Sequence, residues 1–415
     1  MKRIIKTGFS VMMALLGLAV GEITTAQVAM AQETGTPGSG GWVLLDGEST
    51  RLVKAGTNAM YNLRYTEADS IFRELMTRKP DHPAGYFLLA LVDWWRIVPN
   101  SSVKSIVDRH AKSFEERLDK VIEISDKRLE ENSSDIIGLF FKGSALGYRA
   151  RLMVLRGFDG ASLLEWATFA NEGKEAYDII LQCQRLAPSN SDILLGSGLY
   201  NYLGAYIPEK YPIAKAAIGF LPPGDRKIGI SMLRISGQRA QYAATEARYS
   251  LLEVLSLFEN DYASAIPLAE ELHGQYPGNS VFYRFLARNY YMNHDLLRAD
   301  SSYVDILRRV ERREPGYELT LARQGLYYLG DIRLRRGFYE DAVRYLRQSD
   351  DLSRRFGEEE TGWNTMANLK LGQALDRLNR RDEAVRQYRR VLSMDDSNNA
   401  HERAKKYMQT PFQGE

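Results

Sequence analysis

The residue types that most often catalyse reactions or bind metals are few in this 415-residue sequence, and they are not grouped. A zinc site on a helix needs two imidazoles about four residues apart, and thiolate sites need paired cysteines. No two histidines have that spacing, Cys183 is the single cysteine, and no Gly-x-Ser-x-Gly motif is present. We therefore predict no catalytic residue, no metal ligand and no cofactor. Structural or surface roles are expected for the five histidines, His82, His110, His273, His294 and His401.

Three glycines and the cysteine lie in stretches with a helical pattern. Gly196, Gly198 and Gly204 do not follow a strand, as the glycines of a phosphate-binding loop do, so we expect them to allow close packing of helices. Cys183 has no partner for a disulfide within the chain, and its helical context predicts a buried thiol. Acidic pairs such as Glu115-Glu116 are interpreted as solvated helix faces.

Tyrosine is abundant, with 24 residues, and aromatic residues often stand in adjacent pairs. We expect one member of each pair to pack in the core and the other to lie at the edge of a groove. A sharper interpretation is a concave, tyrosine-lined surface that binds a peptide or a glycan, because tyrosine combines apolar area with a polar tip. The pairs are Trp94-Trp95, Tyr290-Tyr291 and Tyr327-Tyr328.

The N-terminus has the organisation of a secretory signal peptide. Basic residues precede twelve mainly apolar residues, Phe9–Val20, a segment too short to span a bilayer as a stable helix. Ala29-Met30-Ala31 fits a cleavage site, with an earlier alternative at Gly21, so residues 1–31 are predicted to be removed; an uncleaved anchor is the alternative. No later apolar run reaches eighteen residues, and no cysteine follows the apolar segment as a lipid-anchor site. A periplasmic or secreted chain without a membrane span is expected.

The charge balance gives no reason to expect nucleic acid as a partner. The whole chain has 55 basic and 53 acidic residues and a pI near 8.4. Residues 1–31 contain Lys2, Arg3, Lys6 and Glu22, so the remaining chain has 52 of each and no net charge. A neutral chain lacks the basic excess that attracts phosphate backbones.

One pattern recurs along the chain: an alanine in the second of two helices, in most copies with a small residue in the helix before it and a large residue four positions after it. In the last copy these are Gly372, Ala384 and Tyr388. The small residue lets the two helices approach, and the large residue fills the space beside the alanine. The five alanines are Ala68, Ala265, Ala299, Ala342 and Ala384. This pattern resembles the tetratricopeptide repeat, a helix-turn-helix unit of about 34 residues.

The resemblance implies an all-α, right-handed solenoid in which each unit packs on its neighbours. We expect about eight helix pairs, closed by a capping helix at Asn399–Met408. After a flexible leader at 32–48, the pairs are divergent over 49–240 and regular over 241–409, and residues 410–415 form a tail.

An insertion near 208–224 interrupts the pairs. With the flanking segments Gly198-Leu199-Tyr200-Asn201-Tyr202 and Gly224-Asp225-Arg226, it is similar to about 40 residues of the inclusion-body-clearance family of tetratricopeptide proteins. That resemblance implies the repeat fold and no particular function. A glycan-acting enzyme with its site around 208–226 is the least favoured interpretation of the chain.

In this repeat family the first helix of each pair lines the concave face, so residues beside the small-residue stripe are expected in a groove. Four arginines against one aspartate make that groove basic, and guanidinium groups suit carboxylates. We predict an acidic or carboxylate-ended peptide, or an acidic glycan, as ligand; a solvated face with local ion pairs is the alternative. The resemblance to carboxylate-clamp repeats is partial, because their asparagines are absent here. The predicted groove residues are Arg284, Arg288, Tyr291, Tyr327, Asp331, Arg335, Gln373 and Arg377.

Together these observations favour an exported scaffold that binds a protein or peptide partner in the periplasm or cell envelope and is not an enzyme. An accessory module that binds a glycan or a substrate during envelope assembly or polysaccharide export is the alternative.

Overall fold

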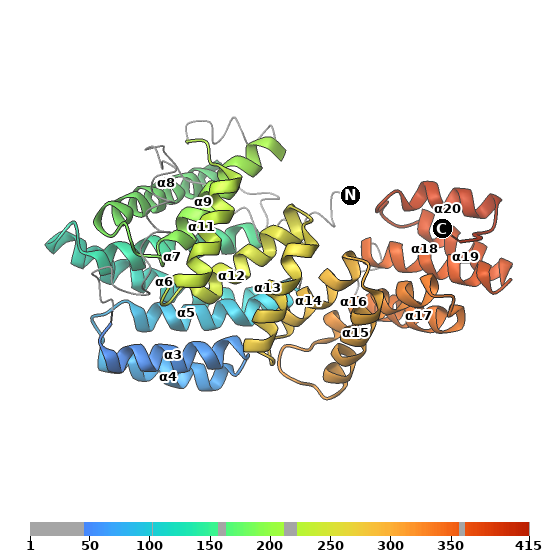
Figure 1. Ribbon diagram of the computed structural model, residues 1–415, viewed down its shortest axis with the longest axis horizontal. Helices are drawn as coiled ribbons and strands as arrows, with labels where there is room; N and C mark the ends of the chain where they lie inside the picture. The colour runs from blue at the N-terminus through green and yellow to red at the C-terminus, as the bar shows by residue number, and fades with distance from the viewer. Residues whose placement is uncertain (1–44, 102, 157–162, 211–221, 357–361, 415) are drawn as a thin grey trace. The chain divides into compact units, whose positions relative to one another are not determined.

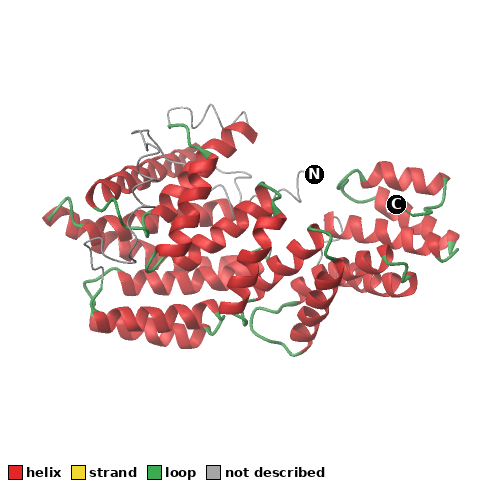
Figure 2. Cartoon of the chain, viewed as in Figure 1, coloured by secondary structure: helices red, strands yellow, loops and turns green. Residues whose placement is uncertain are grey.

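The computed structural model describes residues 45–101, 103–156, 163–210, 222–356 and 362–414. Throughout these ranges the chain forms helices joined by turns and loops, without a strand (Figure 2). The predicted all-α repeat architecture is therefore confirmed. The predicted signal peptide, the predicted leader up to Leu44 and positions 211–221 of the predicted insertion lie outside the described residues. None of the described helices combines the length and the apolar character that crossing a membrane requires.

The described chain divides into two compact units. The N-terminal unit comprises residues 45–260 and 274–278, and the C-terminal unit comprises 261–273 and 279–414. The helices of the first unit are α3 (Gly47–Tyr61), α4 (Tyr65–Arg78), α5 (Ala84–Ile97), the 3-10 turn η1 (Val98–Asn100), α6 (Lys104–Glu131), α7 (Ile136–Arg156), α8 (Leu163–Leu186), α9 (Leu194–Lys210), α11 (Arg226–Arg239), α12 (Ala244–Glu253) and the π-helical turn η2 (Val254–Phe258).

The remaining helices, from α13 to α20, belong mainly to the C-terminal unit. They are α13 (Tyr262–Gln275), α14 (Ser280–Met292), α15 (Leu296–Glu311), α16 (Leu319–Arg335), α17 (Tyr339–Arg355), α18 (Gly362–Arg377), α19 (Arg381–Leu392) and α20 (Ala400–Gln409). Within the described ranges this makes seventeen α-helices, a number that fits the predicted eight pairs and a last helix.

Each helix crossing is built from the repeated small and large residues. A Cβ placed on Gly56 would lie 2.2 Å from the ring of Phe72, and one on Gly330 would lie 2.5 Å from Leu346 Cγ. Real Cβ atoms essentially never approach another atom so closely. The two helices of each crossing are therefore closer together than a residue with a side chain at the glycine position would permit. The five repeat alanines named above are all completely buried, which confirms the predicted register.

Helix pairs also share one kind of turn. The residue two positions before the second helix has left-handed backbone angles at Leu63 (φ 59°), His294 (62°), Gly337 (81°) and Asn379 (59°). The following N–H then donates to the carbonyl five residues back, as Arg64 N does to Ala59 O over 2.9 Å. This arrangement satisfies the last carbonyls of the first helix and reverses the chain.

Glycines in α9 and α11 allow these two helices to pack closely against each other (Figure 1). A Cβ on Gly198 would lie 3.0 Å from Gly229 O, and one on Gly229 would lie 2.5 Å from Tyr202 N. The interpretation of these glycines as packing residues is thus confirmed. Cys183 of α8 is buried as predicted, and burial raises the pKa of its thiol to about 12.

The N-terminal unit is closed by contacts between its first and last helices. Glu246 of α12 accepts hydrogen bonds at Oε1 from Tyr61 Oη (3.1 Å) and from Trp95 Nε1 (2.8 Å). Gly278 N donates to Asn62 Oδ1 over 3.3 Å, although the two residues are 216 positions apart. Thus α3 and α5 are bound directly to the end of the unit.

This closure overturns one prediction about the aromatic pairs. Trp94 and Trp95 are both completely buried, so neither lies at a groove edge. The reason is that other helices cover both side chains. Trp95 Nε1 donates a hydrogen bond to Glu246 of α12, and the ring centre of Trp94 lies 5.8 Å from that of Phe114 in α6.

In each of the other two pairs one member packs in the core, as predicted. Tyr290 and Tyr328 are buried, and their neighbours Tyr291 and Tyr327 are half-buried.

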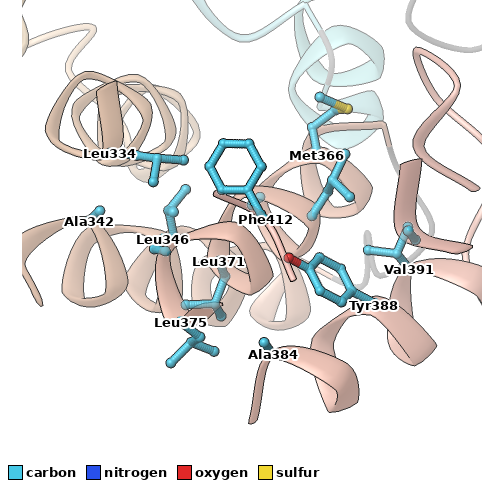
Figure 3. Close-up of a cluster of buried hydrophobic side chains, with 14 of the residues drawn as sticks. Leu334, Ala342, Leu346, Met366, Leu371, Leu375, Ala384, Tyr388, Val391 and Phe412 are labelled. Atoms are coloured by element: carbon cyan, nitrogen blue, oxygen red, sulfur yellow. The ribbon is translucent and has the colours of Figure 1, made fainter. Parts of the chain in front are cut away.

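The last helices share one apolar core (Figure 3). Ala342 and Leu346 of α17 and Ala384 and Tyr388 of α19 meet Leu371 and Leu375 of α18, and Phe412 packs against them from the segment after α20. The terminal helix α20 buries Ala400 and Ala404 on this core. It therefore covers the last apolar face of the array, which is what a capping helix does.

Candidate functional site

A buried carboxylate organises the predicted groove in the C-terminal unit. Asp331 of α16 is completely buried. It accepts a hydrogen bond from Arg335 Nε (2.6 Å) and another from the Tyr291 hydroxyl, and Lys370 Nζ lies 2.7 Å from its Oδ1. Burial alone raises the pKa of Asp331, but the charges of Lys370 and Arg335 outweigh it and hold that pKa below its usual value. Asp331 is therefore ionised at neutral pH, and its charge is compensated.

These contacts fix two groove side chains that α14 and α16 carry. Tyr291 Oη also accepts a hydrogen bond from Arg335 Nη2 over 3.2 Å, so Tyr291, Asp331 and Arg335 form a closed triangle. The Arg335 guanidinium lies 5.5 Å from the centre of the Tyr291 ring. Because hydrogen bonds already fix Tyr291 and Arg335, these side chains lose little conformational entropy when a ligand binds.

An aromatic cluster adjoins the triangle. The rings of Tyr291 and Tyr328 are 4.7 Å apart, and Tyr327 meets Trp363 edge-on at 5.3 Å. Tyr303 of α15 stacks beneath Tyr328 at 4.9 Å. Burial raises the pKa of Tyr291 and Tyr327, so both hydroxyls stay protonated and can donate.

Two further arginines of α14 stand beside the cluster. Arg284 and Arg288 are half-buried, and Arg288 lies 5.8 Å from the centre of the Tyr262 ring. Both charges oppose the rise that burial causes in the pKa of Tyr328. Arg284, Arg288, Arg335 and Lys370 are thus four cationic residues near Asp331.

The remaining two predicted residues are on α18 and take no part in the hydrogen bonds of the triangle. Gln373 is completely buried, and its amide makes no hydrogen bond within the part of the chain that the structure describes. Arg377 donates to Tyr339 Oη (3.0 Å) and to the carbonyl of Gln413 (2.6 Å), near the C-terminus. The structure thus brings six of the eight predicted residues together.

Sequence reasoning missed Lys370 and Trp363. Lys370 is 6% exposed, and it stands between two buried leucines, Leu369 and Leu371. A single charged residue inside such an apolar run indicates that a residue of opposite charge is buried next to it in the folded protein. Trp363 has no such signal, because its contact with Tyr327 depends on the packing of α18 on α16.

Other candidate sites are weaker. Among the described residues, no group of three or more His, Cys, Asp or Glu side chains is placed to hold a metal ion. Beside the insertion, Glu259 accepts hydrogen bonds from Tyr202 Oη (2.6 Å) and from Arg226. The rest of that region falls on positions 211–221, outside the described residues.

Comparison with known proteins supports the repeat assignment. Residues 367–398 match the family model of the tetratricopeptide repeat, which confirms the resemblance in the last regular pair. No curated protein matches the chain.

Solved structures that align with the chain share little sequence with it. One is a tetratricopeptide repeat protein from Parabacteroides merdae ATCC 43184 (14% identity, 77% of this chain and 99% of that chain, TM-score 0.30). Another is the P58(IPK) TPR domain, with 14% identity over 88% of this chain and 98% of that chain and a TM-score of 0.25. A third is the yeast protein Tom70, with 14% identity over 87% of this chain and 95% of that chain and a TM-score of 0.23. These TM-scores mean that the whole chains do not superpose.

Proposed function

Since residues 367–398 are a tetratricopeptide repeat in a chain of helix pairs, we propose that this protein is a scaffold that binds a protein or peptide partner and catalyses no reaction. The observation that carries the proposal is the triangle of Tyr291, Asp331 and Arg335. A completely buried carboxylate costs free energy unless it is paired. Here it holds a tyrosine and an arginine in fixed positions, with aromatic area beside them.

The partner segment is acidic or ends in a carboxylate. Arg284, Arg288 and Arg335 supply guanidinium groups, and Asp331 does not repel an anion because Lys370 and Arg335 compensate it. Guanidinium forks bind carboxylates with two parallel hydrogen bonds, and Tyr291 and Tyr327 add apolar contact. Binding is expected to weaken with salt, because screening acts most strongly on partly exposed charges.

The protein acts outside the cytoplasm, in the periplasm or the medium. This part of the proposal rests on the basic and apolar N-terminal segment and the small-residue cleavage site before Gln32. N-terminal sequencing of the protein from envelope fractions is expected to begin near Gln32. Intact chains starting at Met1 in the membrane pellet would indicate an uncleaved anchor.

The ligand class is tested with defined peptides. The probes are fluorescein-labelled pentaglutamate with a free C-terminus, the same peptide amidated, and pentalysine. The wild type is expected to bind the free acid most tightly and pentalysine least. Replacing Arg284 and Arg288 together by Ala is expected to weaken pentaglutamate binding about tenfold at low salt, an amount equal to roughly 1.4 kcal/mol.

A matched control removes two charges from another face. Arg386 and Arg389 are exposed on α19, and their joint replacement by Ala removes the same charge. Equal loss in both double variants, or no loss in Arg284→Ala/Arg288→Ala with the fold intact, contradicts binding at this surface. Immobilised protein incubated with envelope extract then shows whether a protein or a glycan is retained.

A further inference from the structure

The N-terminal unit contains a cavity of about 170 Å³ that the groove does not involve. Residues of α3, α5, α7, α8 and α9 and of the start of α12 line it. Most of the wall is apolar and includes Leu88, Leu91, Phe141, Ile179 and Leu199. An apolar cavity of about 150 Å³ is large enough to bind benzene, so this cavity has room for a small organic group.

One group of polar side chains also lines the cavity. It consists of Tyr61, Tyr148, Arg151 and Glu246, all at most 7% exposed. Arg151 of α7 lies against the rings of Trp94 (5.0 Å) and Tyr148 (5.3 Å). Charges at this depth are costly unless their hydrogen bonds are made.

Those hydrogen bonds are incomplete. Glu246 Oε1 accepts from Tyr61 and Trp95, but Oε2 accepts no hydrogen bond within the described residues. The Tyr148 hydroxyl has no partner within hydrogen-bond distance among these residues either, although it interacts electrostatically with Glu246 and Arg151. Arg151 Nη1 is 3.8 Å from Glu246 Oε2, which is an ion pair but too long for a hydrogen bond. Its Nη2 is 3.7 Å from a carboxylate oxygen of Glu253.

A carboxylate oxygen without a hydrogen bond among the described residues therefore lies in the cavity wall, beside a guanidinium whose ion pairs are longer than hydrogen bonds. A ligand that donates to Glu246 Oε2 and accepts from Arg151 satisfies both. A carboxylate gives Glu246 no donor and adds a third negative charge beside Glu253. An ammonium gives Arg151 no acceptor and adds a second positive charge. Asp192, the other carboxylate on the wall, is occupied by the backbone N–H groups of Gln241, Tyr242 and Ala243.

We propose that this cavity binds an uncharged, mainly apolar small molecule that carries one group able both to donate and to accept, such as a carboxamide or a hydroxyl. The apolar part lies against Leu88, Phe141 and Ile179, and the polar group lies between Glu246 and Arg151. This site is separate from the partner surface on α14 and α16.

Four probes with the same chain length test the proposal. They are hexanamide, 1-hexanol, hexanoate and hexylamine, titrated into the full chain and followed by saturation-transfer NMR. Hexanamide and 1-hexanol are expected to bind at least about tenfold more tightly than the two charged probes, since each charged probe leaves one buried group unpaired. If the charged probes bind as tightly as hexanamide, or if no probe binds, the proposal is wrong.

Two cavity-filling variants locate the binding. Ser144 of α7 and Thr57 of α3 are half-buried and line the cavity, so Ser144→Phe and Thr57→Phe each occupy its volume. Both are expected to abolish hexanamide binding, whereas Ser301→Phe, at an exposed position of α15, leaves it unchanged. Circular dichroism identifies which variants fold. A folded filling variant that binds hexanamide like the wild type overturns the assignment.

Glu246→Gln tests the polar group itself and needs no added bulk. Tyr61 and Trp95 both donate, so they fix the new amide with its oxygen toward them and its NH₂ toward the cavity. The cavity then presents donors only and has lost one negative charge. The affinity for hexanoate is expected to increase at least about tenfold relative to the wild type. Hexanamide is then expected to bind no more tightly than hexanoate. An unchanged order of affinities contradicts the role of Glu246.

Discussion

Gly372 lies directly against the ring of Tyr388: a Cβ built on Gly372 would be 2.4 Å from Tyr388 Cε1. The ring has no room to move, because it is completely buried and its hydroxyl donates to Asp376 Oδ2 over 2.8 Å. Gly372→Ala is therefore expected to destabilise the C-terminal unit by about 1–3 kcal/mol, although alanine favours helices. Thermal denaturation measures the change. A variant as stable as the wild type would mean that α18 and α19 are further apart than described.

The alanine at the same crossing has no room for a larger side chain. Ala384→Leu adds three carbons at a completely buried position, and overpacking is expected to cost roughly 1–3 kcal/mol. Ala263→Leu makes the same change at an exposed position of α13 and is expected to leave the melting temperature nearly unchanged. If Ala384→Leu is as well tolerated as this control, the register of the last pair is wrong.

The left-handed turns give a pair of opposite predictions. A Cβ on Gly337 meets only Tyr339 Oη at 4.0 Å, so the cost of Gly337→Ala comes from its φ of 81° and is about 1 kcal/mol. His294 is exposed and has the equivalent conformation at 62°. His294→Gly removes the strain and is expected to stabilise the protein by about 0.5 kcal/mol. Urea denaturation compares the two, and shifts of the same sign would contradict the common turn.

The ion pair between Asp331 and Lys370 is expected to be strongly coupled. Asp331→Ala leaves Lys370 buried without its carboxylate and is expected to cost about 3–5 kcal/mol. The double variant Asp331→Ala/Lys370→Met removes both charges and is expected to recover most of that loss. Chemical denaturation of the wild type and the single and double variants forms a complete cycle. Additive costs would show that the two charges do not interact.

One histidine is expected to make the stability depend on pH. Burial and the charge of Arg309 lower the pKa of His273 to about 4, and its ring stacks on Tyr283 at 4.1 Å. In the unfolded chain the pKa is about 6.5, so unfolding takes up a proton at intermediate pH. The stabilisation is complete above pH 6.5 and is lost as the pH falls toward 4.

His273→Gln is expected to flatten the dependence of the melting temperature on pH between 7 and 4.5. His294→Gln, at an exposed histidine, serves as the control and is expected to retain the wild-type slope. Equal slopes in all three proteins would show that His273 is protonated without unfolding.

Local patterns predicted the helices, the turns between them and the crossings, because each depends on residues less than about 40 positions apart. Ala68 and Phe72 show this: the four-residue spacing alone places both in one crossing. The groove was predicted in part for the same reason, since Asp331 and Arg335 are one helical turn apart. Glu246 was not recognised, because its partner Tyr61 is 185 positions away and no periodicity connects them.

The bonds from Glu246 to Tyr61 and from Gly278 to Asn62 also determine how the N-terminal unit folds. In a linear array of repeats the end units can unfold one at a time, because each contacts only its neighbours. Here the first helix pair cannot detach without breaking contacts to the last, so α3 to α12 are expected to unfold as one cooperative block. Closing a loop of some 200 residues costs chain entropy before those contacts form, so the unit is expected to fold slowly for a helical protein. Amide exchange in α3 is then as slow as in α7, at the centre of the unit, although α3 stands at the beginning of the array.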